Sequence, residues 1–275
     1  MKITFTKMSG AGNDFVVVDN RKKIISDPHS FAVKVCDRRL GIGADGLLLL
    51  ETSTNADFMM KYYNADGTDA GMCGNGGRCI AKYAFDLGVV SKERFNFEAL
   101  GYIYEARRIS ATVFDLKMKN PFDLKRDQHI VVSGRTINGN YLNTGTDHCM
   151  LFLDENPGLG SLESADVFGI GRTIRNHALF QPKGTNVNFI SRTATNSIEI
   201  RTYERGVEEE TLACGTGSVA SALLSALKYA MQSPVNVKVR SGEVLEISFQ
   251  KKENMFTDVH LKGNAVVTFT GEIDA

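Results

Sequence analysis

Two cysteines in glycine-rich loops are the residues of this chain best suited to chemistry. Cys73 lies in GMCGNGGRC (71–79) and Cys214 lies in ACGTGS (213–218), so each half of the chain has one Cys-Gly-x-Gly sequence. A glycine turn that opens a helix presents backbone N–H groups without intrahelical acceptors, and the helix macrodipole adds partial positive charge. Each loop can therefore bind a carboxylate or phosphate and favour the thiolate form of its cysteine.

Such a pair of cysteines suits the inversion of an amino-acid α-carbon. A thiolate removes the proton from one face of the carbon, a thiol supplies a proton to the other face, and the two exchange roles in the reverse direction. The loop N–H groups would stabilise the carbanion through its carboxylate, at roughly 3–4 kcal/mol for each donor in comparable oxyanion sites. The paired loops thus predict that Cys73 and Cys214 are the two acid–base residues.

The remaining three of the five cysteines, Cys36, Cys79 and Cys149, are expected to be small buried apolar residues. Their odd total and wide spacing do not resemble a disulfide framework, so thiols in a reducing compartment are predicted. The chain has no CxxC sequence, which argues against a zinc knuckle or a thioredoxin-type motif.

Charge and hydropathy exclude several classes of partner. The 275-residue chain has 32 basic and 32 acidic side chains and no long run of like charge, so neither nucleic acid nor a membrane surface is an expected partner. The N-terminal sequence MKITFTKMSGAG has no apolar signal region, and apolar runs such as Leu47–Leu50 are far too short to span a bilayer. A soluble cytoplasmic protein is therefore expected.

The elements that must position the two loops are mostly strands. Helices are predicted over 30–39, 78–88 and 217–231. Strands are predicted over 3–8, 15–19, 46–51, 57–63, 112–118, 129–134, 149–154, 187–192, 197–204, 235–240, 244–249 and 265–273. This pattern does not alternate as in a βαβ fold. Since GAGNDF (10–15) and TGTDHC (144–149) also resemble each other, a duplicated domain with a boundary near 118–122 is predicted.

These motifs, in this order, resemble those of the diaminopimelate epimerase family. The matching segments are KMSGAGNDFVVVD (7–19), GIGADG (41–46), NADGTDAGMCGNGGRC (64–79), TNV (185–187) and ERGVEEETLACGTGS (204–218). The resemblance implies an α+β fold of two pseudo-symmetric domains, each with strands wrapped around a central helix, and an active site in the cleft between them. The implied domains are 1–119, with 263–275 packing back on it, and 120–262.

The resemblance also implies a reaction, which is the epimerisation of LL- to meso-2,6-diaminopimelate in lysine and peptidoglycan synthesis. No cofactor and no metal are implied, and a cytoplasmic homodimer is expected. Gly74, Asn75, Gly215 and Thr216 would bind the reacting carboxylate. Asn13 would hold the reacting amino group. The distal end of the substrate would be read by Asn64, Thr146, Asn186, Glu204 and Arg205. An arginine fork suits a carboxylate, and a glutamate suits an ammonium group.

The chain departs from the family pattern at four positions near these motifs. Ser9, Gly46, Thr146 and Asp147 stand where family members often have histidine, glutamine, asparagine and proline. Asp147 adds a carboxylate that could point away, pair with Arg205 or alter specificity. His148 matches the pattern, either as an orienting or as a structural residue.

The same residues suit other functions less well. GIGADG matches GxGxxG, but a helix precedes it and a strand follows it, which is the wrong context for a dinucleotide site. The glycine loops could bind phosphate, but GxxxxGK[ST] does not occur. A thiol redox protein, a proline-racemase-like enzyme and a non-enzymatic binding module stay open as alternatives. The predicted distal set favours a long, doubly charged substrate, and the second cysteine argues against a mere binding module.

Overall fold

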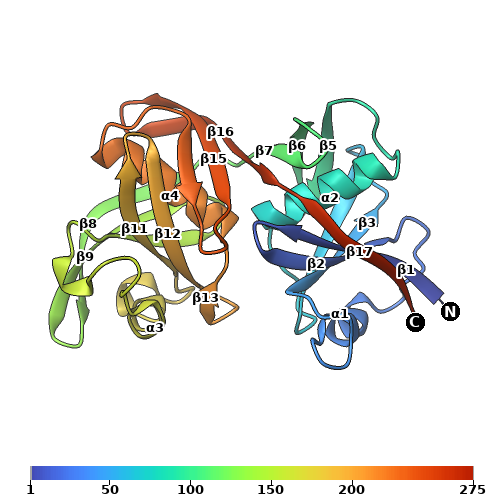
Figure 1. Ribbon diagram of the computed structural model, residues 1–275, viewed down its shortest axis with the longest axis horizontal. Helices are drawn as coiled ribbons and strands as arrows, with labels where there is room; N and C mark the ends of the chain where they lie inside the picture. Colours follow the sequence, from blue (N-terminus) through green and yellow to red (C-terminus); the bar gives the residue numbers. More distant parts are fainter. Residues whose placement is uncertain (1, 275) are drawn as a thin grey trace. The chain divides into compact units, whose positions relative to one another are not determined.

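The computed structural model describes residues 2–274 and divides into two compact units (Figure 1). The first unit comprises the chain up to Lys117 and the C-terminal segment from Lys262, and the second unit comprises Met118–Leu261. The halves expected from the sequence, 1–119 with 263–275 and 120–262, differ from these units by one or two residues at each boundary.

The first unit is a set of strands with two helices. Its strands are β1 (Lys2–Gly10), β2 (Asn13–Asp19), β3 (Gly46–Glu51), β4 (Phe58–Asn64), β5 (Arg94–Ala99), β6 (Tyr102–Arg108), β7 (Val113–Lys117) and β17 (Val266–Asp274). Its helices are α1 (Pro28–Cys36) and α2 (Gly74–Asp86). Strand β17 pairs antiparallel with β1, which joins the C-terminal segment to the beginning of the chain.

The second unit is built in the same way. Its strands are β8 (Phe122–Val132), β9 (Arg135–Asn143), β10 (Asp147–Phe152), β11 (Asn186–Ala194), β12 (Ser197–Glu204), β13 (Glu209–Thr211), β14 (Val235–Lys238), β15 (Val244–Lys252) and β16 (Met255–Asn264), the last of which runs beyond the unit. Its α-helices are α3 (Val167–Arg175) and α4 (Gly215–Lys228), and short 3₁₀ turns cover Pro157–Leu159 and Ala178–Phe180.

The strand pairings of the two units repeat each other. In the first unit β2 pairs parallel with β3, β3 antiparallel with β4, and β4 parallel with β5. In the second unit β10 pairs parallel with β11, β11 antiparallel with β12, and β12 parallel with β14. Helices α1 and α3 lie in the equivalent crossovers, and α2 and α4 follow β4 and β12 with its short β13. The predicted α+β class with two pseudo-symmetric domains is confirmed.

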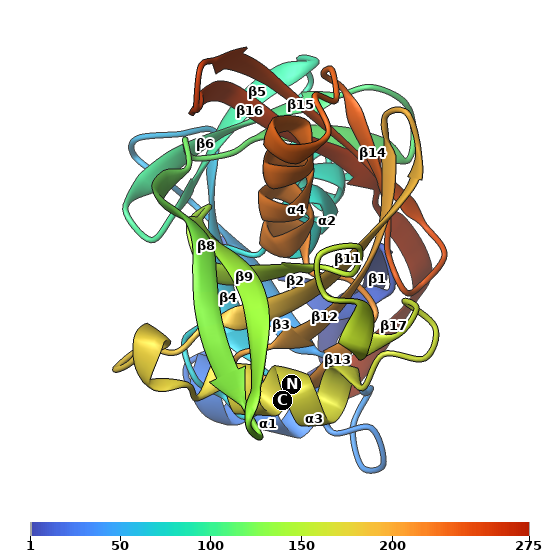
Figure 2. The same cartoon turned by 90° about the vertical axis from the view of Figure 1, so that its left-hand side faces the viewer.

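Each unit packs its strands against a helix that carries one of the glycine motifs. Helix α4 contacts β10, β11, β12, β14 and β15, and Figure 2 shows it near β11, β12, β14 and β15. Residues Gly215–Ala226 of α4 are all buried. Because a helix that is buried all round must be apolar or small on every face, the run GTGSVASALLSA suits this central position.

The helices begin earlier than the sequence predicted. Helix α2 begins at Gly74 rather than at 78, and α4 spans Gly215–Lys228 rather than 217–231. Helix α1 begins at Pro28, because Asp27 caps it by accepting a hydrogen bond from the Ser30 backbone N–H at 3.2 Å. The glycines of both loops are therefore the first turn of a helix and not a separate loop before it.

Several elements were missed by the sequence analysis. Helix α3 was missed because Gly169 and Gly171 lower its helix propensity, although Asp166 caps it by accepting from the Gly169 N–H at 2.8 Å. Strands β5, β6, β9, β13 and β16 were also missed. The β5–β6 hairpin turns at Leu100 and Gly101, both with positive φ, and a leucine in that conformation gives no turn signal.

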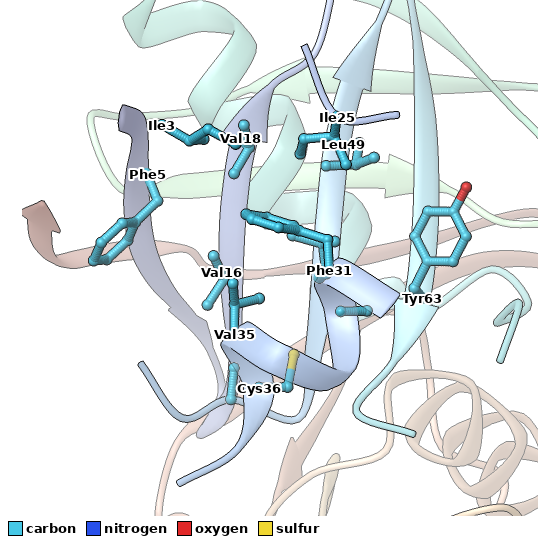
Figure 3. Close-up of a cluster of buried hydrophobic side chains, with 13 residues drawn as sticks. Ile3, Phe5, Val16, Val18, Ile25, Phe31, Val35, Cys36, Leu49 and Tyr63 are labelled. Carbon is cyan, nitrogen blue, oxygen red and sulfur yellow. The ribbon is translucent and has the colours of Figure 1, made fainter. Parts of the chain in front are cut away.

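The core beneath α1 gives a stability prediction. Phe31, Val35 and Cys36 of α1 face strand residues that include Val16 and Leu49 (Figure 3). Val35→Ala is expected to lower the free energy of unfolding by about 2–3 kcal/mol, because two buried methyl groups are lost and a cavity is left. Urea unfolding measures the change. Val33→Ala is the matched control, since Val33 is 49% exposed on the same helix; equal effects in both variants would contradict this packing.

Candidate active site

Cys73 is the N-cap residue of α2. Its backbone is extended, with φ −107° and ψ 121°, and its sulfur accepts from the Gly76 N–H at 3.5 Å. The first backbone N–H that bonds within the helix is that of Gly77, which donates to the Cys73 carbonyl at 2.8 Å. The N–H groups of Gly74 and Asn75 therefore precede the helical hydrogen bonds, as in an anion site at a helix N-terminus.

The side chain of Asn75 does not belong to this anion site. It is buried, and its Oδ1 accepts from Arg78 Nη2 at 2.9 Å. Arg78 is itself fully buried and its Nη1 donates to the Gly74 carbonyl at 3.2 Å. Arg78 thus stabilises the first turn of α2 through these buried hydrogen bonds. This role was not predicted from the sequence.

Asn13 lies beside Cys73 in an orientation fixed by Asp45. Asn13 Nδ2 donates to Asp45 Oδ2 at 2.6 Å, and the Cys73 thiol donates to Asn13 Oδ1 at 3.5 Å. Because a carboxylate only accepts, the amide nitrogen must face Asp45 and the amide oxygen must face the cysteine. Arg38 Nη2 in turn donates to Asp45 Oδ1 at 2.7 Å. The GIGADG motif therefore supplies Asp45, the residue that orients Asn13, a role that was not predicted from the sequence.

Asp14, next to Asn13, is a partly buried carboxylate whose ionisation makes the stability of this region depend on pH. Burial favours its neutral form, but hydrogen bonds and charges from Arg38 and Lys7 outweigh burial and lower the pKa of Asp14 from 3.8 to about 2. Its side chain is 21% exposed, and Lys7 Nζ lies 2.7 Å from Oδ2. Since the pKa is lower in the folded state, the stabilisation is complete above pH 5 and is lost as the pH falls towards 2.

Asp14→Asn is accordingly expected to lower the free energy of unfolding by about 2 kcal/mol at pH 7 and by about half as much at pH 3. Urea unfolding of both proteins at a series of pH values measures this difference. A difference that stays constant from pH 7 to pH 3 would show that the ionised carboxylate does not stabilise this region.

Strand register places Asn64 at the same sheet edge as Asn13. Phe15 of β2 pairs with Gly46 of β3, and Gly46 pairs with Asn64 at the end of β4. Asn64 Nδ2 donates to Thr68 Oγ1 at 3.0 Å. At Gly46 an added Cβ would lie 2.5 Å from the Tyr62 ring and 2.6 Å from the Tyr63 carbonyl. The glutamine common in the family would therefore not fit here unless the chain moved.

Cys214 occupies the equivalent position in the second unit. It is the N-cap of α4, with φ −117° and ψ 111°, and it is 5% exposed. The Ser218 N–H is the first to bond within the helix, to the Cys214 carbonyl at 2.9 Å. The first-turn N–H groups at Gly215 and Thr216 therefore correspond to those at Gly74 and Asn75. The Thr216 hydroxyl lies 3.6 Å from the Cys214 sulfur.

His148 orients the Thr216 side chain. Its Nε2 lies 2.9 Å from the hydroxyl oxygens of both Thr216 and Thr146, which are 3.0 Å apart. Its Nδ1 faces Asn188 Nδ2 at 3.1 Å, and that amide nitrogen also donates to the Cys149 carbonyl. The network therefore assigns the proton to Nε2. Complete burial lowers the pKa of His148 to about 3, so the ring is neutral.

The predicted distal residues converge at one sheet edge of the second unit. His148 pairs with Asn186 in the parallel β10–β11 ladder, and Val187 pairs with Tyr203 near the end of β12. Asn186 Nδ2 donates to the Asp147 carbonyl and its Oδ1 accepts from the Arg205 N–H, both at 2.8 Å. Glu204 Oε2 accepts from the Thr211 hydroxyl at 2.9 Å. Asn186 thus connects the strand ends on which Asp147 and Arg205 lie.

The remaining cysteines lie in the core as predicted. Cys36, Cys79 and Cys149 are at most 3% exposed. Burial raises the pKa of Cys36 to about 12 and that of Cys149 further above its usual range. The thiols of Cys36 and Cys149 are therefore protonated at neutral pH. Within residues 2–274, no cluster of histidine, cysteine and carboxylate side chains has a metal-binding arrangement.

The helices of the described part of the chain are too short or too polar to cross a membrane.

Within each unit, the structure brings predicted site residues together. The first unit joins Asn13, Cys73, Gly74 and Asn75, with Asn64 at the same sheet edge. The second unit joins Cys214, Gly215, Thr216 and Thr146, and it places Asn186, Glu204 and Arg205 at the edge where β10 begins.

Comparisons with known proteins agree with this organisation. The family model described as diaminopimelate epimerase matches residues 5–107 and 140–267. Diaminopimelate epimerase of Chlorobaculum tepidum is 42% identical over 97% of this chain and 99% of its own length. That of Aquifex aeolicus is 39% identical over 98% and 97%. The solved structure of a probable proline racemase from Agrobacterium radiobacter has a TM-score of 0.76 at 14% identity, and covers 99% of this chain and 93% of that chain.

Proposed function

Because the chain belongs to the diaminopimelate epimerase family, we propose that it interconverts LL- and meso-2,6-diaminopimelate without pyridoxal phosphate. The observation that carries the proposal is the same in both units. Each unit has a cysteine as the N-cap of a buried helix whose first turn is rich in glycine. A single loop of this kind would serve binding alone, whereas two of them supply the two proton-transfer groups that inversion requires.

In the proposed reaction the two cysteines act on opposite faces of one α-carbon. The thiolate of one cysteine takes the α-proton, and the electron pair of the broken C–H bond is delocalised into the substrate carboxylate. The thiol of the other cysteine then donates its proton to the opposite face. The thiolate and thiol have exchanged places after one turnover, so the enzyme is ready for the reverse reaction.

Backbone N–H groups at the two helix starts would stabilise the carbanion. The α-carboxylate is proposed to accept hydrogen bonds from the N–H groups of Gly74, Asn75, Gly215 and Thr216. Each such preorganised donor contributes roughly 3–4 kcal/mol in comparable sites. Asn13 has its amide oxygen directed away from Asp45, which leaves an acceptor suited to the substrate's α-ammonium group.

The distal half of the substrate would be recognised at the sheet edges. Arg205 provides a guanidinium for the distal carboxylate, and Glu204 provides a carboxylate for the distal ammonium. Asn64, Thr146 and Asn186 are proposed to complete this recognition. We also propose that the protein works in the cytoplasm as a homodimer, in lysine and peptidoglycan synthesis.

A stereochemical assay tests the proposed function. The reduced protein is incubated with LL-diaminopimelate in buffer free of pyridoxal phosphate, and the isomers are separated by chiral chromatography. Formation of the meso isomer is the expected result. L-Proline is the comparison substrate, because the probable proline racemase has the same fold. Inversion of proline, with diaminopimelate left unchanged, would replace the proposal by a proline-racemase-like activity.

A further inference from the structure

Asp147 and Arg205 form an ion pair at the edge where the distal residues meet. Asp147 is the first residue of β10, and Arg205 directly follows the last residue of β12. Arg205 Nη1 lies 3.0 Å from Asp147 Oδ2, and the two side chains are 26% and 13% exposed. Of the three possibilities that the sequence left open for Asp147, the structure therefore shows pairing with Arg205.

The Asp147 carboxylate is held from both sides. Its Oδ1 accepts from the Tyr141 hydroxyl and from Asn143 Nδ2, the latter at 2.9 Å, while Oδ2 accepts from Arg205. Partial burial favours the neutral acid, but these hydrogen bonds and the charge of Arg205 lower the pKa of Asp147 below its usual value. The carboxylate is therefore ionised and fixed, and it cannot swing away without breaking several hydrogen bonds.

Within the described residues, the Arg205 guanidinium makes its contacts through Nη1. Nη1 also lies 3.2 Å from the Gly184 carbonyl and 3.4 Å from the Lys183 carbonyl. Among the described residues, Nε and Nη2 have no acceptor within hydrogen-bonding distance. Because a guanidinium has five donors in a planar fork, fixing Nη1 leaves the Nε–Nη2 edge available for a bidentate contact with a second carboxylate.

We propose that Asp147 is a positioning residue that holds Arg205 by Nη1 and so presents its Nε–Nη2 edge to the distal carboxylate of the substrate. The inference rests on the proposed function for the identity of the substrate. Asp147 does not compete with the substrate for Arg205, since the two carboxylates take different edges of the guanidinium. A ligand without a distal carboxylate makes no use of this arrangement.

The Asp147→Asn variant tests the proposal through its different effects on the binding of different ligands. For diaminopimelate the variant is expected to raise KM roughly 10-fold and to change kcat less than about 3-fold, as for a lost charged hydrogen bond that acts in binding. Calorimetry with two probes that each carry one of the two distal groups separates the ends of the ligand. 2-Aminopimelate keeps the distal carboxylate and lacks the distal amine, whereas lysine keeps the amine and lacks the carboxylate. The variant should bind 2-aminopimelate roughly 10-fold more weakly and lysine unchanged.

Three results would overturn the proposal. Equal weakening of both probes would indicate a general structural role, tighter binding of 2-aminopimelate would indicate competition for Arg205, and unchanged binding of both would indicate no role. Asp123→Asn is the matched control, since Asp123 pairs with Lys125 on an exposed part of the same unit. If Asp147→Asn does not fold, Tyr141→Phe removes one donor to Asp147 and should give a smaller loss of the same selectivity.

The two proposals can fail separately. A wild-type protein that binds 2-aminopimelate through the Asp147-dependent site but does not epimerise diaminopimelate would refute the proposed function and keep the positioning role. A wild-type protein that epimerises diaminopimelate, with an Asp147→Asn variant of unchanged KM, would refute the positioning role alone.

Discussion

Alanine at either Cys73 or Cys214 is expected to lower the kcat for epimerisation of LL-diaminopimelate by about 10³-fold or more. General acid–base groups contribute roughly 10²–10⁴-fold each, and alanine has no proton to give or take. Loss of either cysteine leaves one face of the α-carbon without its group, so the two single variants should be impaired to a similar extent. Chiral chromatography of the products measures the rate of inversion in each.

The chain contains its own controls for this experiment. Cys79→Ala lies on the same helix as Cys73, and Cys149→Ala lies in the same unit as Cys214; both side chains are buried in the core. These controls should retain activity close to that of the wild type, with at most a modest loss of stability. Full turnover by Cys73→Ala or Cys214→Ala would defeat the assignment of two acid–base residues.

Alanine at Gly217 is expected to lower kcat/KM by roughly 100-fold. An added Cβ there would lie 2.4 Å from Asn188 Oδ1, 3.2 Å from His148 Cε1 and 3.3 Å from the Cys214 Cβ. The first turn of α4 or the buried His148–Asn188 pair must therefore move, and Cys214 and Thr216 move with it. A misplacement of about 1 Å at reacting groups can cost roughly 100-fold in rate. Overpacking should also lower the free energy of unfolding by about 1–3 kcal/mol.

Steady-state kinetics and urea unfolding check both parts of this prediction. Gly158→Ala is the matched control, because an added Cβ at Gly158 meets no atom within 4 Å and its φ is not positive. Gly158→Ala should leave kcat/KM unchanged. A Gly217→Ala protein with wild-type kcat/KM would show that the close packing behind Cys214 does not position the catalytic residue.

The presence of a helix after each glycine motif could be predicted because it depends on local chemistry, whereas the α+β class was implied by the resemblance of the ordered motifs to a known family. Strong helix formers soon after each Cys-Gly-x-Gly sequence predict a helix within a dozen residues. The duplicated order of elements is also visible in the sequence, since the pattern repeats once. The extent of the helices was less predictable, because GNGG has low helix propensity and becomes helical only through tertiary packing of α2 against the strands.

Other parts of the structure depend on contacts between distant residues. Helix α3 forms despite two glycines, and Gly171 is needed because an added Cβ would lie 2.5 Å from Tyr203 Cβ. The pairing of Asn13 with Asp45 joins residues 32 positions apart, and that of Asp147 with Arg205 joins residues 58 apart. Neither pair has a sequence signal of its own. Only the strand register brings them together. Asp45 was therefore not identified from the sequence as a partner of Asn13, and pairing of Asp147 with Arg205 was one of three possibilities.

Isotope incorporation tests the central claim most directly. The reduced wild-type protein is incubated with LL-diaminopimelate in D₂O without pyridoxal phosphate, and the reaction is stopped at low conversion. Two cysteines on opposite faces predict that the meso product carries one deuterium, at the inverted α-carbon, because the donating thiol has exchanged with solvent. The recovered LL substrate should remain almost fully protonated, since the accepting thiol returns the original proton. Deuterium entering the recovered substrate as fast as product forms, or protium retained at the inverted carbon, would indicate a single base and contradict the two-cysteine mechanism.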